Sequence, residues 1–160
     1  MNMYEFSIQM EHDAELLYRN LASKTDHKGI KSIFTMLADD EAKHAKAVET
    51  LQRKSTSTEN KSSMSEVKTI FSQIKDQSEI PSTEILEELK KALDIEKKGR
   101  DFYSEKFSEL DTEEGKSLFQ KLSRQEDYHY KTVANIIEMV EKPLWWVEHA
   151  EFTPMGDDYY

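Results

Sequence analysis

Apolar residues recur every three or four positions in four stretches of the chain, which is the spacing of helices that bury one face. The first stretch covers about residues 3–24 and the second about 29–53. The third begins after Pro81, and the fourth covers about 112–141 and ends before Pro143. Apolar residues at this spacing in the four stretches include Phe6, Met10, Leu17, Leu21, Ile33, Leu37, Ala38, Ala45, Val48, Ile85, Leu89, Leu93 and Leu118. The pattern predicts an all-α protein built from four long helices.

The connections between these helices favour one topology. Residues 25–29 form a short polar break, so the first two helices should pair as an antiparallel hairpin, and the last two likewise. The second and third helices are separated by about 30 residues, enough to run the length of a bundle and return. Within that connection we expect an exposed polar stretch at 54–65 and a short helix at 67–74. One long crossover between two hairpins predicts a ferritin-like four-helix bundle, and hairpins exchanged between two chains remain an alternative.

One domain is predicted over residues 1–142, followed by an aromatic C-terminal tail at 143–160. The tail contains both tryptophans, Trp145 and Trp146, with further aromatic residues among acids. We expect it to form a short helix and an extended strap that packs on the bundle or on a partner subunit. Docking of a redox partner is the alternative role of the tail.

The two halves of the chain repeat one pattern of polar residues at a displacement of 85 positions. The segment Glu41-Ala42-Lys43-His44 recurs as Glu126-Asp127-Tyr128-His129. The matched polar residues include Glu11 with Glu96, Tyr18 with Tyr103, Glu41 with Glu126, and His44 with His129. Each half therefore carries one lone Glu, one Tyr and one Glu-x-x-His motif.

This set of residues is typical of a dinuclear metal site. Residues three apart share a helix face, so each Glu-x-x-His motif presents a carboxylate and an imidazole in the same direction. A Glu from each of two helices and a Glu-x-x-His motif from each of two others are the ligands of di-metal centres in four-helix bundles. Carboxylates and imidazoles bind iron or manganese. The predicted ligands of two iron ions per chain, with manganese as an alternative, are Glu11, Glu41, His44, Glu96, Glu126 and His129. The competing interpretation is an old duplication whose Glu and His residues lie incidentally on the surface.

Two tyrosines are candidate catalytic residues outside the ligand set. Tyr18 and Tyr103 follow Glu11 and Glu96 by two helical turns, close enough to donate hydrogen bonds to ligand carboxylates across the bundle. Ordinary core aromatics are the alternative interpretation. The remaining histidines lack ligand spacing and are not expected to bind metal: His12, His27 and His149.

Composition and charge exclude several function classes. The net charge is −10 and no basic stripe is present, so no nucleic-acid partner is expected. The absence of cysteine excludes disulfides, thiolate metal sites, iron–sulfur clusters and cysteine nucleophiles. No apolar run approaches the roughly 20 residues of a membrane span. The N-terminus also lacks the features of a signal peptide, so we expect a cytoplasmic protein without membrane association.

The chain resembles the rubrerythrin family over about residues 3–140, with all six ligand positions filled. The segments that carry the resemblance are 10–18, 37–45, 95–103 and 122–129. The resemblance implies a ferritin-like fold, a non-haem di-iron centre in which Glu41 and Glu126 bridge the ions, and frequently a homodimer. It also implies reduction of hydrogen peroxide in oxidative-stress defence.

Two departures from the family bear on activity. Rubrerythrins proper carry a rubredoxin module with four cysteines; this sequence has none, so electrons must come from a separate donor such as a rubredoxin-type protein. Their extra Glu on the third helix also has no counterpart, because Leu93 and Gly99 stand one turn either side of Glu96.

Hydrogen peroxide needs two electrons, which two Fe(II) ions can supply, and this favours peroxide over oxygen as the oxidant. Ferroxidase activity, iron sequestration without turnover, a manganese catalase and a purely structural scaffold are the alternatives.

Overall fold

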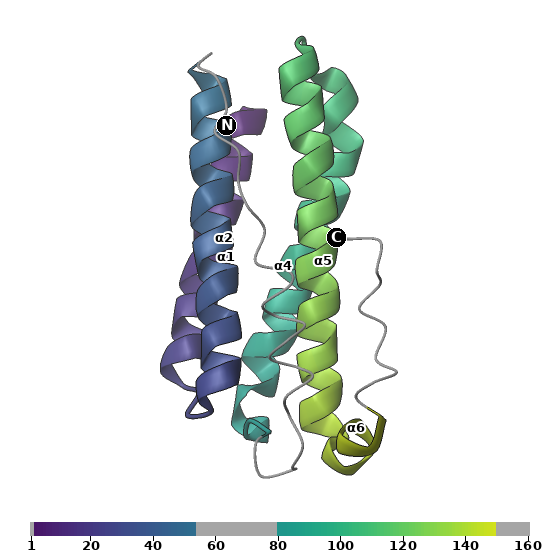
Figure 1. Ribbon diagram of the computed structural model, residues 1–160. Coiled ribbons are helices and arrows are strands. Elements are labelled where there is room, and N and C mark those ends of the chain that lie inside the picture. The colour runs from purple at the N-terminus through teal and green to yellow at the C-terminus, as the bar shows by residue number, and fades with distance from the viewer. Residues whose placement is uncertain (1, 54–79, 150–160) are drawn as a thin grey trace.

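The computed structural model describes residues 2–53 and 80–149, which form a bundle of long helices (Figure 1). The long helices are α1 (Met3–Ser23), α2 (Lys28–Gln52), α4 (Leu86–Lys106) and α5 (Glu113–Glu141). The shorter elements are η2 (Thr83–Ile85), η3 (Phe107–Glu109) and α6 (Pro143–His149). These residues contain no strand, and none of their helices is long and apolar enough to cross a membrane. The all-α prediction is confirmed.

Side chains at the helix starts explain where three of the helices begin. The side chain of Asn2 accepts a hydrogen bond from the backbone N–H of Glu5 at 2.9 Å, and the Glu5 carboxylate accepts one from the Asn2 N–H at 3.0 Å. Thr112 caps α5 by accepting from the N–H of Gly115. At the start of α2, Nδ1 of His27 accepts from a backbone N–H, so this histidine serves as a helix cap.

The direction of the helices identifies the topology. α1 packs mainly on α2 and α4 mainly on α5, giving the two predicted hairpins. The turn between α1 and α2 lies beside the start of α4, because Lys24 Nζ contacts Glu88 Oε1 at 2.7 Å. α2 and α4 therefore begin at the same end and run parallel (Figure 1). This is the ferritin-like arrangement, which an up-down-up-down bundle does not have. The short helix predicted at 67–74 lies outside the described residues.

Two apolar clusters fill the bundle and leave a polar layer between them. One includes Phe34, Leu89 and Ile136, and the other includes Val48 and Phe119; all five side chains are fully buried. Each such side chain contributes roughly 1.5–3 kcal/mol to folding through removal of apolar surface from water. The clusters thus hold the four helices in fixed register on both sides of the polar layer.

The short helix α6 adds to this core. Pro143 begins α6, directly after the end of α5, a position at which proline is tolerated. Trp146 is 1% exposed and packs in the same cluster as Phe34, whereas Trp145 is 42% exposed. Residues 150–160 of the predicted tail lie outside the described residues.

Candidate metal centre

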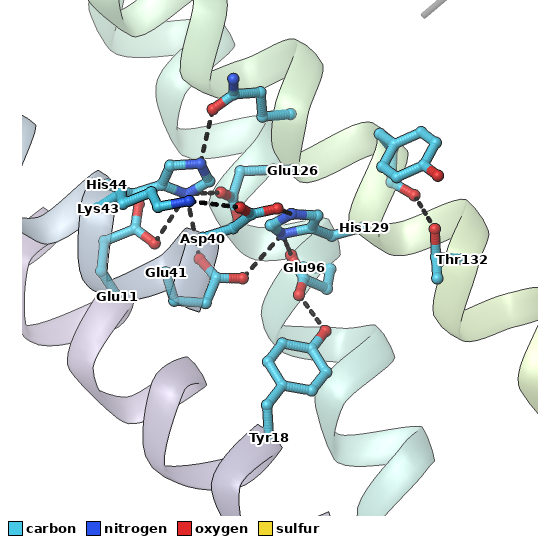
Figure 2. A network of polar contacts seen from close by, with 12 residues as sticks. Glu11, Tyr18, Asp40, Glu41, Lys43, His44, Glu96, Glu126, His129 and Thr132 are labelled. Carbon is cyan, nitrogen blue, oxygen red and sulfur yellow. Dashed lines mark hydrogen bonds and ion pairs between the residues drawn. The ribbon is translucent and has the colours of Figure 1, made fainter. Parts of the chain in front are cut away.

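The polar layer contains all six predicted metal ligands. α1 and α4 each contribute one glutamate, and α2 and α5 each contribute a glutamate and a histidine one turn apart (Figure 2). The six residues, none more than 2% exposed, are Glu11, Glu41, His44, Glu96, Glu126 and His129. The interpretation of these residues as incidental surface groups is therefore wrong. Charged side chains are almost never fully buried without a partner, so their convergence calls for a chemical explanation.

The two histidines direct the same ring nitrogen toward the carboxylates. His44 Nδ1 lies 2.8 Å from Glu126 Oε1, 3.1 Å from Glu41 Oε2 and 3.5 Å from Glu11 Oε2. His129 Nδ1 lies 2.8 Å from Glu41 Oε1 and 3.7 Å from Glu96 Oε2. The two rings are nearly parallel, with centroids 5.5 Å apart. Glu41 therefore touches both histidines, one with each carboxylate oxygen.

Four of these residues satisfy the spacing of a metal site by themselves. One ligand atom from each of Glu41, His44, Glu126 and His129 can be chosen so that all four lie within 4.8 Å of one another. Glu11 and Glu96 flank this group on the other two helices. The repeat seen in the sequence is thus an approximate two-fold symmetry of the site.

Both tyrosines make the hydrogen bonds predicted from their spacing. Tyr18 on α1 donates to Oε1 of Glu96 on α4, and Tyr103 on α4 donates to Oε1 of Glu11 on α1. Each bond joins one hairpin to the other, and both phenols are at most 1% exposed. Each tyrosine therefore holds one oxygen of a glutamate and leaves the other directed at the histidines.

Two further polar residues belong to the site and were missed by the sequence analysis. His44 Nε2 donates to Gln125 Oε1 at 2.6 Å, and His129 Nε2 lies 3.2 Å from Asp40 Oδ2. Asp40 and Gln125 each precede the Glu of a Glu-x-x-His motif and are separated by the same 85 positions as the ligands. The repeat was the signal that could have found them, but their different residue types concealed the match.

Burial and crowding shift the pKa values of these groups strongly. Burial, together with the charge of Glu96, raises the pKa of Glu41 to about 8. Burial and the charges of Glu11 and Glu41 raise the pKa of Glu126 well above its usual range. Burial also raises the pKa of Glu11, but the charge and hydrogen bond of His44 outweigh it and hold that pKa below its usual value. Without a cation, the cluster therefore retains protons at neutral pH.

The histidines and tyrosines keep their protons for a related reason. Burial opposes the charged form of His44 and His129, yet the surrounding glutamates raise the pKa of both well above the usual value. Burial and the neighbouring carboxylates also raise the pKa values of Tyr18 and Tyr103, so both phenols remain hydrogen-bond donors.

The cluster has the unsatisfied acceptors that a bound cation would use. Glu96 Oε2 is buried without a hydrogen-bond partner, and Glu126 Oε1 has only the contact with His44 Nδ1 at 2.8 Å, a nitrogen that a cation would replace. Leaving a buried carboxylate oxygen unpaired is costly. Gly99 provides the room for Glu126, because a Cβ at this position would lie only 2.9 Å from Glu126 Oε2. The donor set of oxygens and imidazole nitrogens suits iron or manganese.

The other histidines lie away from this cluster. His12 is on the solvent side of α1, where its ring is half exposed and lies near Glu15. His27 caps α2, and His149 is the last residue of α6. Leu93 packs against an apolar cluster.

Comparison with known proteins identifies the family. A protein-family model described as Rubrerythrin matches residues 2–137, which include all four long bundle helices up to Ile137 on α5. No curated protein and no solved structure matches the chain. The match covers most of the chain, and the observed bundle and its buried Glu and His residues are those that the resemblance implies. The chain belongs to the rubrerythrin family.

Proposed function

We propose that this protein is a di-iron oxidoreductase that reduces hydrogen peroxide in defence against oxidative stress. The observation that carries the proposal is the buried cluster of four glutamates and two histidines, with both Nδ1 atoms directed at carboxylates. Membership of the rubrerythrin family supports the same function.

The symmetry of the cluster suggests how two ions would be held. Glu11 and His44 would serve one ion, and Glu96 and His129 the other. Glu41 reaches both histidines with its two oxygens, as a bridging carboxylate must. By symmetry and family resemblance, Glu126 would be the second bridge. Four carboxylates then balance the four positive charges of two divalent ions, which makes burial of the whole set less costly.

The residues around the ligands prepare the site and keep bulk water out. Tyr18 and Tyr103 orient the two lone glutamates, and the apolar clusters cover the polar layer on both sides. His44 and His129 hold protons on Nδ1 in the absence of metal and must release them when a cation takes that place. Loading should therefore release protons and become tighter as the pH rises.

Two ferrous ions bound here would supply the two electrons that convert hydrogen peroxide and two protons into two molecules of water. These 160 residues contain no cysteine that could hold an electron-transfer iron, so we propose an external donor for the electrons that restore the ferrous state. A rubredoxin-type protein or a small reductant would fit this role. Manganese is compatible with the same ligands.

Iron oxidation is the second candidate function, and one feature of α4 favours it. Leu93 and Gly99, one turn either side of Glu96, cannot coordinate a metal, and the space beside Gly99 is taken by Glu126. The six residues thus match the minimal symmetric ligand set without the additional Glu of rubrerythrins proper. A ferroxidase or an iron-sequestering protein needs no more than this.

The test compares two oxidants. Protein loaded anaerobically with Fe(II) is mixed with hydrogen peroxide or with oxygen at equal concentration, and the oxidation rate is followed by absorbance. We expect faster oxidation by peroxide and no uptake of Fe(II) beyond two per chain. Faster oxidation by oxygen, with continued uptake of Fe(II), would instead identify a ferroxidase. The double variant Glu87→Ala, Glu105→Ala is the control, because both residues are exposed and lie on α4 away from the cluster.

A further inference from the structure

The two halves of the cluster differ at one pair of equivalent positions. The ligands and the tyrosines match in type across the repeat, but Asp40 in the first half corresponds to Gln125 in the second. Each of these residues contacts Nε2 of the histidine from the opposite hairpin. Figure 2 shows Asp40 beside His129. One histidine therefore faces a carboxylate and the other a neutral amide.

Both contacts fix the orientation of the imidazole ring in the same way. Asp40 and Gln125 are 7% and 8% exposed. A carboxylate or amide oxygen can only accept, so Nε2 of each histidine carries the hydrogen and Nδ1 is left for the cluster. The two halves therefore share the orientation of the histidine ring and differ in the charge of the residue that contacts Nε2.

The charge changes how strongly each histidine can donate electrons to a metal. A carboxylate that accepts the N–H of a ligand histidine makes the ring more basic, and charge-assisted hydrogen bonds are roughly twice as strong as neutral ones. The neutral contact of Gln125 is shorter, at 2.6 Å against 3.2 Å for Asp40, but the amide brings no net charge. Lys43 Nζ lies 3.7 Å from the other oxygen of Asp40, and its side chain is 49% exposed, so water screens its charge.

We propose that Asp40 and Gln125 are positioning residues that make the two metal positions unequal. The position served by His129, backed by the Asp40 carboxylate, fills first, and the position served by His44 fills second. This inference rests on the proposed di-metal site. Partners of this kind typically change metal affinity by about 10–100-fold, so the two affinities should differ by about tenfold or more.

The test is an anaerobic titration of the full chain with Co(II), followed by calorimetry and by visible absorbance. We expect two separate binding steps. Asp40→Asn preserves shape but removes the charge, so the first step should weaken about tenfold and merge with the second. Gln125→Glu should tighten the second step. The double variant Asp40→Asn, Gln125→Glu moves the carboxylate to the other half, so two separate steps should return with the spectra of the first- and second-bound Co(II) exchanged.

Asp39→Asn is the matched control. Asp39 precedes Asp40 but is half exposed and pairs with Arg19 at 2.8 Å. Asp39→Asn therefore changes the net charge by the same amount as Asp40→Asn without altering a contact to a ligand histidine. A shift of the first step as large as that of Asp40→Asn would show a long-range charge effect and overturn the inference. Two Co(II) bound equally in the parent, or unchanged steps in Gln125→Glu, would also overturn it while leaving the di-metal site intact. Fewer than two Co(II) in the parent would overturn the proposed function and this inference together.

Discussion

Gly99→Ala isolates the contact between helix α4 and the carboxylate of Glu126. An added Cβ would lie 2.9 Å from Glu126 Oε2 and 3.5 Å from its Cγ and Cδ. Ordinary contact begins at 3.4 Å, so the carboxylate must move by about half an ångström or turn out of its rotamer. The side chain is buried in the cluster, so this motion displaces a proposed bridging ligand.

The size of the effect differs between the metal-free and the loaded protein. Alanine stabilises a helix interior by about 1 kcal/mol relative to glycine, and an off-rotamer side chain costs about 0.5–1.5 kcal/mol. These effects oppose each other, so the free energy of unfolding of the metal-free variant should stay within about 1 kcal/mol of the parent. Metal affinity has no such compensation and should fall at least about tenfold, or about 1.4 kcal/mol.

Urea unfolding of the metal-free protein and calorimetric titration with Co(II) measure the two quantities. Ala14→Gly is the matched control, because Ala14 occupies the equivalent position in the first half and is also buried. It should lose about 1 kcal/mol of stability and still bind two ions. If Gly99→Ala binds metal with the affinity of the parent, Glu126 is not held as a ligand against α4, and the reasoning fails.

Three further outcomes follow from the structure. Tyr18→Phe and Tyr103→Phe each remove a hydrogen bond to one oxygen of a ligand glutamate. Calorimetry should therefore show Co(II) binding weakened by about 10-fold or more in either variant. Unchanged Co(II) affinity would contradict the orienting role of the tyrosines. In the folded metal-free protein Glu41 has a pKa of about 8 and keeps its proton, whereas in the unfolded chain it loses that proton near the usual pKa of 4.5. The melting temperature of the metal-free protein should therefore fall as the pH rises from about 5 to 8. A melting temperature that rises over this range would contradict the assigned pKa shift. Trp146→Ala removes a fully buried side chain and should cost about 3–5 kcal/mol in urea unfolding, with metal stoichiometry retained by the variant while folded; a cost below about 1 kcal/mol would show that α6 does not pack on the core.

The helices and their topology could be predicted because they depend on short-range features of the sequence. Apolar spacing and helix-breaking residues located α1, α2 and α5 to within a residue or two of their observed ends, and the unequal connection lengths indicated the parallel pair α2 and α4. The same local signals predicted Thr112 near the start of α5. They indicated a cap for α2 within the polar break at 25–29 but did not single out His27, because histidine is an unusual residue at that position.

The ligand set could be predicted because the repeat pairs residues of the same type. The residues that contact Nε2 of the two histidines could not be predicted in this way. Asp40 and Gln125 occupy equivalent positions with different chemistry, so identity matching does not pair them. Only the packing of α2 against α5 reveals that each reaches the histidine of the other hairpin. The contact between Gly99 and Glu126 is likewise a property of helix packing, which spacing along one helix cannot report.

The metal content of the reconstituted protein decides whether the six buried residues hold two metal ions. Protein loaded anaerobically with Fe(II) and freed of excess metal should contain two iron ions per chain by elemental analysis. The variant Glu41→Ala, Glu126→Ala should contain fewer than one, while the control Glu87→Ala, Glu105→Ala should match the parent. Fewer than one iron ion in the parent, or two retained in the variant that lacks Glu41 and Glu126, would show that these six residues do not form the metal site.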